Sequence, residues 1–166
     1  LYLFKSLKKI IKINKNIKIY FCGSKKKYSF KIFDYIKLNR LEKNIIYLGN
    51  ISQKKLEYYY MHCLAVILPS IYESSSLVAL EAINYKKPII SADIPPMNEL
   101  NKIFRINIFN LRNEKTLHRI INSFVKNKKK FISDANWNYK NLEKNSWKYT
   151  LAPVKKLLNS DFKKII

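Results

Sequence analysis

Short apolar runs alternate with segments of helical spacing along most of this 166-residue chain, and this alternation limits the possible folds more than any other feature. The runs are rich in branched side chains, as in strands that are covered on both faces. The segments between them repeat their apolar residues at the spacing of a helix. Repeated strand–helix units of this kind indicate an α/β protein with an open, Rossmann-like, doubly wound parallel sheet.

The expected elements follow from this spacing and from the residues that begin or end helices and strands. We expect helices at 3–13, 28–38, 52–62, 77–84 and 114–125, and strands at 17–22, 45–48, 64–68, 88–91 and 107–109. Ser52 is expected to cap the third helix. Pro69 is expected to end the third strand, which should be buried on both faces, because proline has no amide hydrogen to donate. Pro95 and Pro96 are expected to form a loop.

Length and composition predict a single globular domain with an ordinary core, because 48% of the 166 residues are hydrophobic. No apolar run approaches the roughly 20 residues that a transmembrane helix requires. Cys22 and Cys63 lie far apart, without the paired spacing of a disulfide framework or a zinc site. This cysteine usage favours a reducing cytoplasm.

The net charge of +22, from 33 Lys and Arg against 11 Asp and Glu, is the feature most open to misinterpretation. Nearly all of the positive charge is lysine, and it is spread over predicted helices and loops. A nucleic-acid-binding protein would instead concentrate Arg and aromatic side chains on one surface. We therefore interpret the charge mainly as a solvated surface. A second use would be to attract phosphorylated ligands and to hold the protein near anionic lipid.

The most specific motif is the segment Pro69–Ala82, in which two carboxylates, Glu73 and Glu81, stand eight positions apart around a bend. Three serines form the bend and directly precede the predicted helix at 77–84. Serines at a helix N-terminus can satisfy its unpaired amide groups, and such an end attracts anions, above all phosphate. The segment therefore indicates a site for a phosphorylated ligand.

This motif, Pro-Ser-x-Tyr-Glu followed by a small-residue bend and Leu-x-x-x-Glu-Ala, resembles the Glu-x7-Glu signature of the family 4 (group 1) glycosyltransferases. These are retaining enzymes of the GT-B fold, whose C-terminal domain binds a nucleotide-sugar donor. Residues 86–100 resemble the family's next strand and loop, and residues 17–23 and 44–51 resemble its two strand-plus-glycine segments. The resemblance covers nearly the whole chain.

The resemblance implies a role for each carboxylate. Glu81 would bind the ribose hydroxyls of the nucleotide, a task suited to a side chain that only accepts hydrogen bonds. Glu73 would contact the hexose and support an oxocarbenium-like transition state, which makes it the candidate catalytic residue. Backbone amides of the bend would meet the sugar hydroxyls and the pyrophosphate. The candidate bend residues are Ser74, Ser75, Ser76 and Leu77, where the family usually has Gly-Phe-Gly-Leu-Pro.

The chain's two glycines, Gly23 and Gly49, each directly follow a predicted strand. A glycine there allows a positive φ or the close approach of a ligand, and a tight strand-to-helix turn is the plainer interpretation. The resemblance implies that Gly23 with Ser24, and Gly49 with Asn50 and Ile51, line the nucleotide. The first of these loops lacks the second glycine that is common in the family.

The predicted domain boundaries are 1–133 for the Rossmann-like nucleotide-sugar-binding domain and 134–166 for a C-terminal helical segment. The segment carries an apolar stripe of Leu151, Val154, Leu157 and Leu158. The resemblance implies that it packs back toward an N-terminal acceptor domain. Residues 1–7 resemble a helix that follows the family's first loop, so the chain is expected to be an N-terminally truncated fragment that is inactive alone.

The expected function is transfer of a hexose from a nucleotide-diphosphate sugar, such as UDP- or GDP-hexose, to a glycan or lipid-linked acceptor in surface polysaccharide synthesis. No cofactor and no metal are expected. The enzyme would be cytoplasmic, with peripheral association at the inner face of the membrane. Two alternatives are an epimerase-like GT-B protein that performs no transfer and a basic nucleic-acid-binding module. The Glu73/Glu81 pair and its Pro-Ser-x-Tyr-Glu lead-in argue against the epimerase-like protein.

Overall fold

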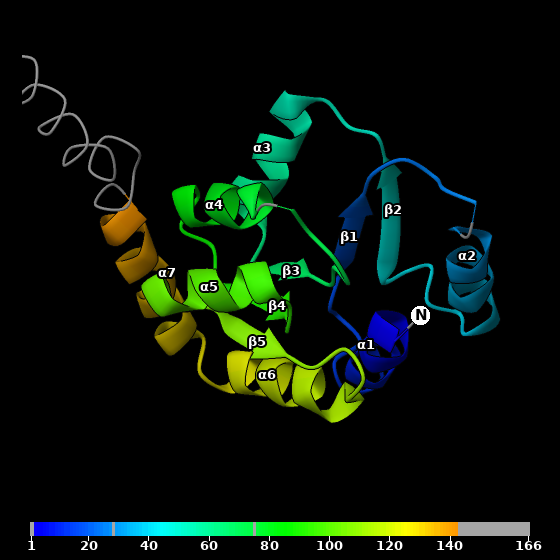
Figure 1. Cartoon of the computed structure of the whole chain (residues 1–166). Coiled ribbons are helices and arrows are strands. Elements are labelled where there is room, and N and C mark those ends of the chain that lie inside the picture. The colour runs from blue at the N-terminus through cyan, green and yellow to red at the C-terminus, as the bar shows by residue number, and fades with distance from the viewer. Residues whose placement is uncertain (1, 28, 75, 143–166) are drawn as a thin grey trace, which may run out of the picture.

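The structure is a computed structural model that describes residues 2–27, 29–74 and 76–142. Helices and strands alternate through the first two thirds of the chain, and two helices follow one another at the end of the described part (Figure 1). The elements are α1 (Tyr2–Ile13), β1 (Ile19–Cys22), α2 (Ser29–Leu38), β2 (Ile45–Gly49), α3 (Gln53–His62), β3 (Val66–Leu68), α4 (Leu77–Asn84), β4 (Ile89–Ala92), α5 (Pro95–Ile103), β5 (Asn107–Phe109), α6 (Glu114–Lys126) and α7 (Lys128–Leu142). The predicted α/β class is confirmed.

All described strand pairs are parallel, as predicted, but the strands form two sheets, β1-β2 and β3-β4-β5. The third strand is shorter than expected, because the sheet ladder begins only at Val66. Leu64, which we expected within this strand, is 65% exposed. The prediction that the strand is buried on both faces is also wrong, since Val66 and Ile67 are only half-buried.

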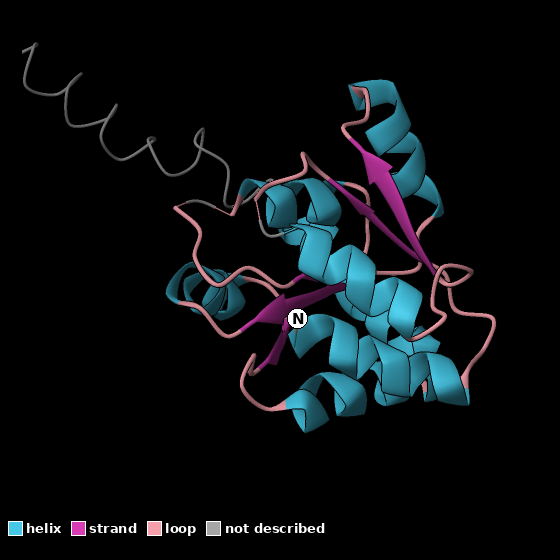
Figure 2. Ribbon diagram, turned by 90° about the vertical axis from the view of Figure 1, so that its right-hand side faces the viewer, coloured by secondary structure: helices cyan, strands magenta, loops and turns pink. Residues whose placement is uncertain are grey.

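Helices cover the strands on both sides, with α1 and α6 below them and α3 and α4 above them in Figure 1. Figure 2 shows the same layers from the side. The centre of the core is β4, whose four residues are all buried. One cluster of buried residues includes Ile45 of β2 and Ile89 of β4, so the two sheets share a single hydrophobic core. Within the described residues, no helix is long and apolar enough to cross a membrane.

The predicted loop at Pro95 and Pro96 is wrong, because these residues form the first turn of α5. A helix leaves its first amide groups without intrahelical partners, so proline loses nothing there and its fixed φ suits the helix. Met97 in the same turn is fully buried, which fixes the helix against the core. The side-chain amide of Asn98 also donates to Asp93 Oδ1 at 2.8 Å, which ties the helix to the end of β4.

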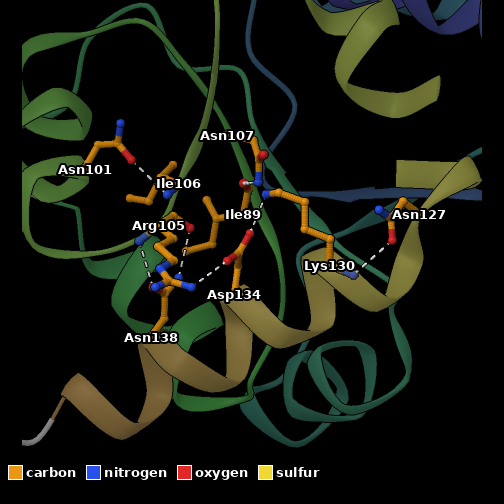
Figure 3. Close-up of polar contacts among 9 residues, drawn as sticks. All are labelled: Ile89, Asn101, Arg105, Ile106, Asn107, Asn127, Lys130, Asp134 and Asn138. Carbon is orange, nitrogen blue, oxygen red and sulfur yellow. Dashed lines mark hydrogen bonds and ion pairs between the residues drawn. The ribbon is translucent and has the colours of Figure 1, made fainter. Parts of the chain in front are cut away.

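Helix α7 is fastened to the segment before β5 by polar contacts (Figure 3). Asn138, only 1% exposed, accepts a hydrogen bond from the Arg105 amide at 2.7 Å and donates one to the Arg105 carbonyl at 3.0 Å. The Arg105 guanidinium pairs with Asp134 Oδ1 at 2.9 Å and lies 4.4 Å from the centre of the Trp137 ring. Burial alone would raise the pKa of Asp134, but the hydrogen bonds from Lys130 and Arg105 outweigh it and hold the pKa below its usual range.

Helix α7 continues without a break through residues 133 and 134, where the sequence suggested a division between two segments. The division stays a prediction, because most of the second segment lies beyond the described residues. The apolar stripe of Leu151, Val154, Leu157 and Leu158 also lies outside them. Both cysteines are free thiols: Cys22 is exposed and Cys63 is half-buried.

Replacing Asn138 with alanine should destabilise the protein, because it leaves the Arg105 amide and carbonyl without their buried partner. An unsatisfied buried polar group costs about 1–3 kcal/mol, so we expect a loss of about 2–4 kcal/mol in the free energy of unfolding. Urea unfolding of the complete protein measures it. Asn136→Ala, an exposed position on the same helix, is the matched control and should change little. Equal effects of the two substitutions would show that the Asn138 contacts contribute nothing.

Candidate functional site

The carboxyl ends of β1 and β2 meet at the two glycines. The Gly23 amide donates to the Gly49 carbonyl at 2.9 Å, and the Tyr47 hydroxyl donates to the Gly23 carbonyl at 2.5 Å. Gly23 has φ +129° and Gly49 has φ +68°, so the expected positive φ is confirmed at both positions. A Cβ added at either glycine would meet no atom within 4 Å. The backbone conformation therefore favours glycine at both positions, and the space beside both residues is open.

The residues that follow these glycines are accessible. Ser24 and Asn50 are exposed, and Ile51 is half-buried. Beside them, the Lys25 ammonium lies 5.1 Å from the centre of the Phe33 ring and 5.8 Å from that of Tyr47. A cation over aromatic faces is held without losing its charge. This edge of β1 and β2 thus combines open backbone with a positive side chain.

Glu73 is held in the loop that follows β3. The Ser70 hydroxyl donates to Glu73 Oε1 at 2.6 Å. The second carboxylate oxygen, Oε2, is buried and has no hydrogen-bond partner among the described residues. A buried acceptor without a donor is costly, and such groups require an explanation in a native structure.

Helix α4 begins with its first amides uncapped. Ser76 is the N-cap residue, but its side chain makes no capping hydrogen bond, contrary to our expectation for the serines. The reason is its backbone conformation, φ −103° and ψ 39°, because a capping side chain normally needs an extended backbone. Ser74 and Leu77 on either side are exposed, and Ser75 is not among the described residues. The Ala79 amide donates to the Ser76 carbonyl at 3.0 Å. The amides of Leu77 and Val78 have no backbone partner within the described residues, so they are the first-turn donors open to an anion.

Glu81 lies on the exposed side of α4, away from the buried Ala79, Ala82 and Ile83. Its Oε2 accepts a hydrogen bond from the Tyr60 hydroxyl at 2.9 Å. Tyr60 belongs to α3 and is only 6% exposed. Burial, then the hydrogen bond to Glu81 and its negative charge, raise the pKa of the Tyr60 phenol well above its usual range. The phenol therefore remains a donor.

The structure brings some of the predicted residues together and leaves others apart. It joins Gly23 to Gly49, and it places Ser74, Ser76 and Leu77 at the start of the helix that carries Glu81. The described residues contain no hydrogen bond between either glycine and either Glu73 or Glu81. They also contain no group of three His, Cys, Asp or Glu side chains that could hold a metal ion.

Sequence reasoning missed two hydroxyl donors, Ser70 for Glu73 and Tyr60 for Glu81. A signal existed for Tyr60. Ser52 caps α3 as predicted, with its Oγ accepting from the Lys55 amide at 3.4 Å. Counting from this cap, Leu56 and Tyr60 share one face of the helix at a spacing of four. This spacing selects Tyr60 as the buried member of three consecutive tyrosines, and a buried tyrosine hydroxyl usually has a partner.

Residues 1–144 match the family described as glycosyl transferases group 1. The match extends over most of the chain and includes every candidate site residue. The chain therefore belongs to the group 1 glycosyl transferase family, and the predicted family is confirmed. No curated protein sequence matches the chain.

Solved structures show the same fold. HepE of Anabaena in complex with UDP-glucose superposes with a TM-score of 0.78 at 18% identity, over 96% of this chain and 44% of that one. The pneumococcal O-GlcNAc transferase GtfA, in complex with UDP and GlcNAc, gives 0.71 at 18% identity, over 96% and 32%. The C-terminal domain of a group 1 family protein, LpcC of Francisella tularensis, gives 0.75 at 16% identity, over 87% and 77%.

These similarities assign the fold of a GT-B glycosyltransferase C-terminal domain. The chain spans less than half the length of HepE and of GtfA, at 44% and 32%. It corresponds more nearly to the separate C-terminal domain of LpcC, of which it covers 77%.

Proposed function

We propose that this chain binds the donor of a hexosyltransferase, a nucleotide-diphosphate sugar, around the start of α4. The proposal rests on the hydrogen bonds of Glu73 and Glu81. One oxygen of each carboxylate accepts a hydrogen bond from a protein hydroxyl, Ser70 or Tyr60. The other oxygen has no donor among the described residues. The uncapped amides of the first turn of α4 lie between the two carboxylates in the chain.

This arrangement suits the three parts of a sugar nucleotide. Glu81 would accept hydrogen bonds from the ribose diol, and Glu73 Oε2 would accept one from a hexose hydroxyl. The diphosphate would lie at the N-terminus of α4, where the helix dipole and free amides favour negative charge. The nucleotide would extend toward the open backbone of Gly23, Ser24, Gly49, Asn50 and Ile51. No metal or cofactor takes part in this proposal.

In the proposed reaction, the bond between the anomeric carbon and the diphosphate oxygen breaks, and the acceptor hydroxyl oxygen bonds to that carbon. The acceptor proton passes to the departing diphosphate. Positive charge develops at the sugar beside Glu73, and negative charge develops at the diphosphate beside the α4 amides, so both are stabilised. Retention of configuration, with attack on the face that the leaving group vacates, is proposed on the resemblance of the motif to a retaining family.

The proposed donor is a UDP- or GDP-hexose, and the complexes of HepE with UDP-glucose and of GtfA with UDP support the uridine form. We propose a glycan or lipid-linked acceptor of surface polysaccharide synthesis, bound by an N-terminal domain of the same protein. The proposed location is the cytoplasm. There the net charge of +22 would favour phosphorylated donors and peripheral contact with anionic lipid.

Titration calorimetry with UDP, GDP and a short DNA duplex tests the proposal against a basic nucleic-acid-binding module. One of the two nucleoside diphosphates should bind to the complete protein. Its affinity should fall much less with added salt than the affinity for the duplex. The duplex should bind weakly and lose affinity steeply with added salt. Tight duplex binding at physiological salt, with neither diphosphate bound, would contradict the proposal.

Glu81→Ala should weaken binding of the preferred nucleoside diphosphate by about 1.5–3 kcal/mol, which is roughly 10- to 150-fold in Kd. The reason is the loss of hydrogen bonds from the ribose hydroxyls to a charged acceptor. Calorimetry on the complete protein measures the Kd. Glu57→Ala, an acid on α3, is the control and should leave the Kd unchanged. An unchanged affinity in Glu81→Ala would remove the ribose assignment.

Glu73→Gln should act on catalysis rather than on nucleotide binding. We expect turnover to fall by about 100- to 1,000-fold, because the substitution removes negative charge from beside the developing oxocarbenium. The Kd for the nucleoside diphosphate should stay nearly unchanged, since this part of the donor lies away from Glu73. Steady-state kinetics and calorimetry on the same preparation measure both quantities. Equal losses in the two would indicate a folding defect instead.

A further inference from the structure

The Tyr60 side chain is fixed on several sides. Its ring is buried and stacks on the Tyr85 ring with centroids 5.1 Å apart and planes 5° from parallel. Its own carbonyl accepts a hydrogen bond from Cys63 Sγ at 3.5 Å, where α3 ends. The Lys87 ammonium donates to the Met61 carbonyl at 2.8 Å, which ties the end of α3 to the turn after α4. The Tyr60 hydroxyl is therefore held at a defined point between two helices.

Glu81 has no such support from its own helix. It is exposed on the outer side of α4, where a long side chain has several accessible rotamers. Among the described residues, only the Tyr60 hydroxyl donates to it, through Oε2 at 2.9 Å. This one hydrogen bond from a rigid phenol selects a single position for the carboxylate. Oε1 has no donor among the residues that the structure describes.

We infer that Tyr60 is the positioning residue that presets the Glu81 carboxylate for the 2′- and 3′-hydroxyls of a bound ribonucleotide. The inference rests on the proposed donor function of Glu81 and adds a specificity to it: preference for ribonucleoside over 2′-deoxyribonucleoside diphosphates. Holding a side chain in its bound position before the ligand arrives reduces the ordering that binding requires. The hydrogen bond of Tyr60 to a charged partner is of the stronger kind.

The electrostatics of the pair support the assignment. The raised pKa of the Tyr60 phenol keeps it protonated, so it donates to Glu81 and does not compete as an anion. Burial, then the charges of Glu57 and Glu81, also raise the pKa of Tyr85, the ring on which Tyr60 stacks.

The test is Tyr60→Phe in the complete protein, which removes the hydroxyl and keeps the ring that stacks on Tyr85. Titration calorimetry gives the Kd for UDP and for 2′-deoxy-UDP, or for the guanosine pair if GDP binds more tightly. We expect the Kd for UDP to rise about three- to tenfold, as for the loss of one hydrogen bond. The ratio of the Kd for 2′-deoxy-UDP to the Kd for UDP should also decrease in this variant. Tyr58→Phe, an exposed neighbour on α3, is the control and should change neither value.

If Tyr60 had a purely structural role, Tyr60→Phe would raise the Kd for UDP and the Kd for 2′-deoxy-UDP by the same factor. The ratio of the two Kd values would then stay unchanged, and this result would overturn the inference. In a Glu81→Ala background, Tyr60→Phe should have no further effect on the Kd. If Glu81→Ala weakens UDP binding but Tyr60→Phe leaves the ratio of the 2′-deoxy-UDP and UDP Kd values unchanged, the inference fails and the proposed donor binding stands. If the wild-type protein binds neither diphosphate, or Glu81→Ala has no effect, the proposed function fails and the inference fails with it.

Discussion

The complete burial of β4 is the constraint on which the described structure depends. Its four residues are all buried, and it pairs with β3 on one side and β5 on the other. Ala79, Ala82 and Ile83 of α4 are fully buried, and α4 packs on this strand. Burying a large aliphatic side chain such as Ile83 of α4 contributes about 1.5–3 kcal/mol, which favours this position of the helix. Because Ala79, Ala82 and Ile83 face the core, Glu81 lies on the outer side of the helix.

The two candidate carboxylates share one arrangement, although they lie in different surroundings. Glu73 is in a loop and takes its donor from Ser70, three residues earlier. Glu81 is on a helix and takes its donor from Tyr60 of another helix. In each case one oxygen is held by the protein and the other has no donor within the described residues. Together with the uncapped start of α4, this pattern provides acceptors for hydroxyls and donors for phosphate, the combination that a sugar nucleotide requires.

The sequence predicted the order of elements well, because apolar spacing directly reflects which side chains reach the core. The positive φ of both glycines was also open to prediction, since it depends on local chemistry, and the roles of Glu73 and Glu81 stay predictions. Other features depend on contacts between distant residues and could not be predicted. The start of β3 is set by pairing with β4, and the exact partner of Glu81 is set by how α3 packs on α4. The Pro95-Pro96 pair is compatible with either a loop or a helix start, and the buried Met97 decides for the helix.

The most direct test of the central claim is a crystal structure of the complete protein with its preferred nucleoside diphosphate bound. The account predicts the ribose hydroxyls within hydrogen-bond distance of the Glu81 carboxylate, with Tyr60 still donating to Oε2. It also predicts the diphosphate at the first-turn amides of α4 and the nucleoside beside Gly23 and Gly49. A diphosphate bound elsewhere, with Glu81 turned to solvent and the start of α4 unoccupied, would contradict it.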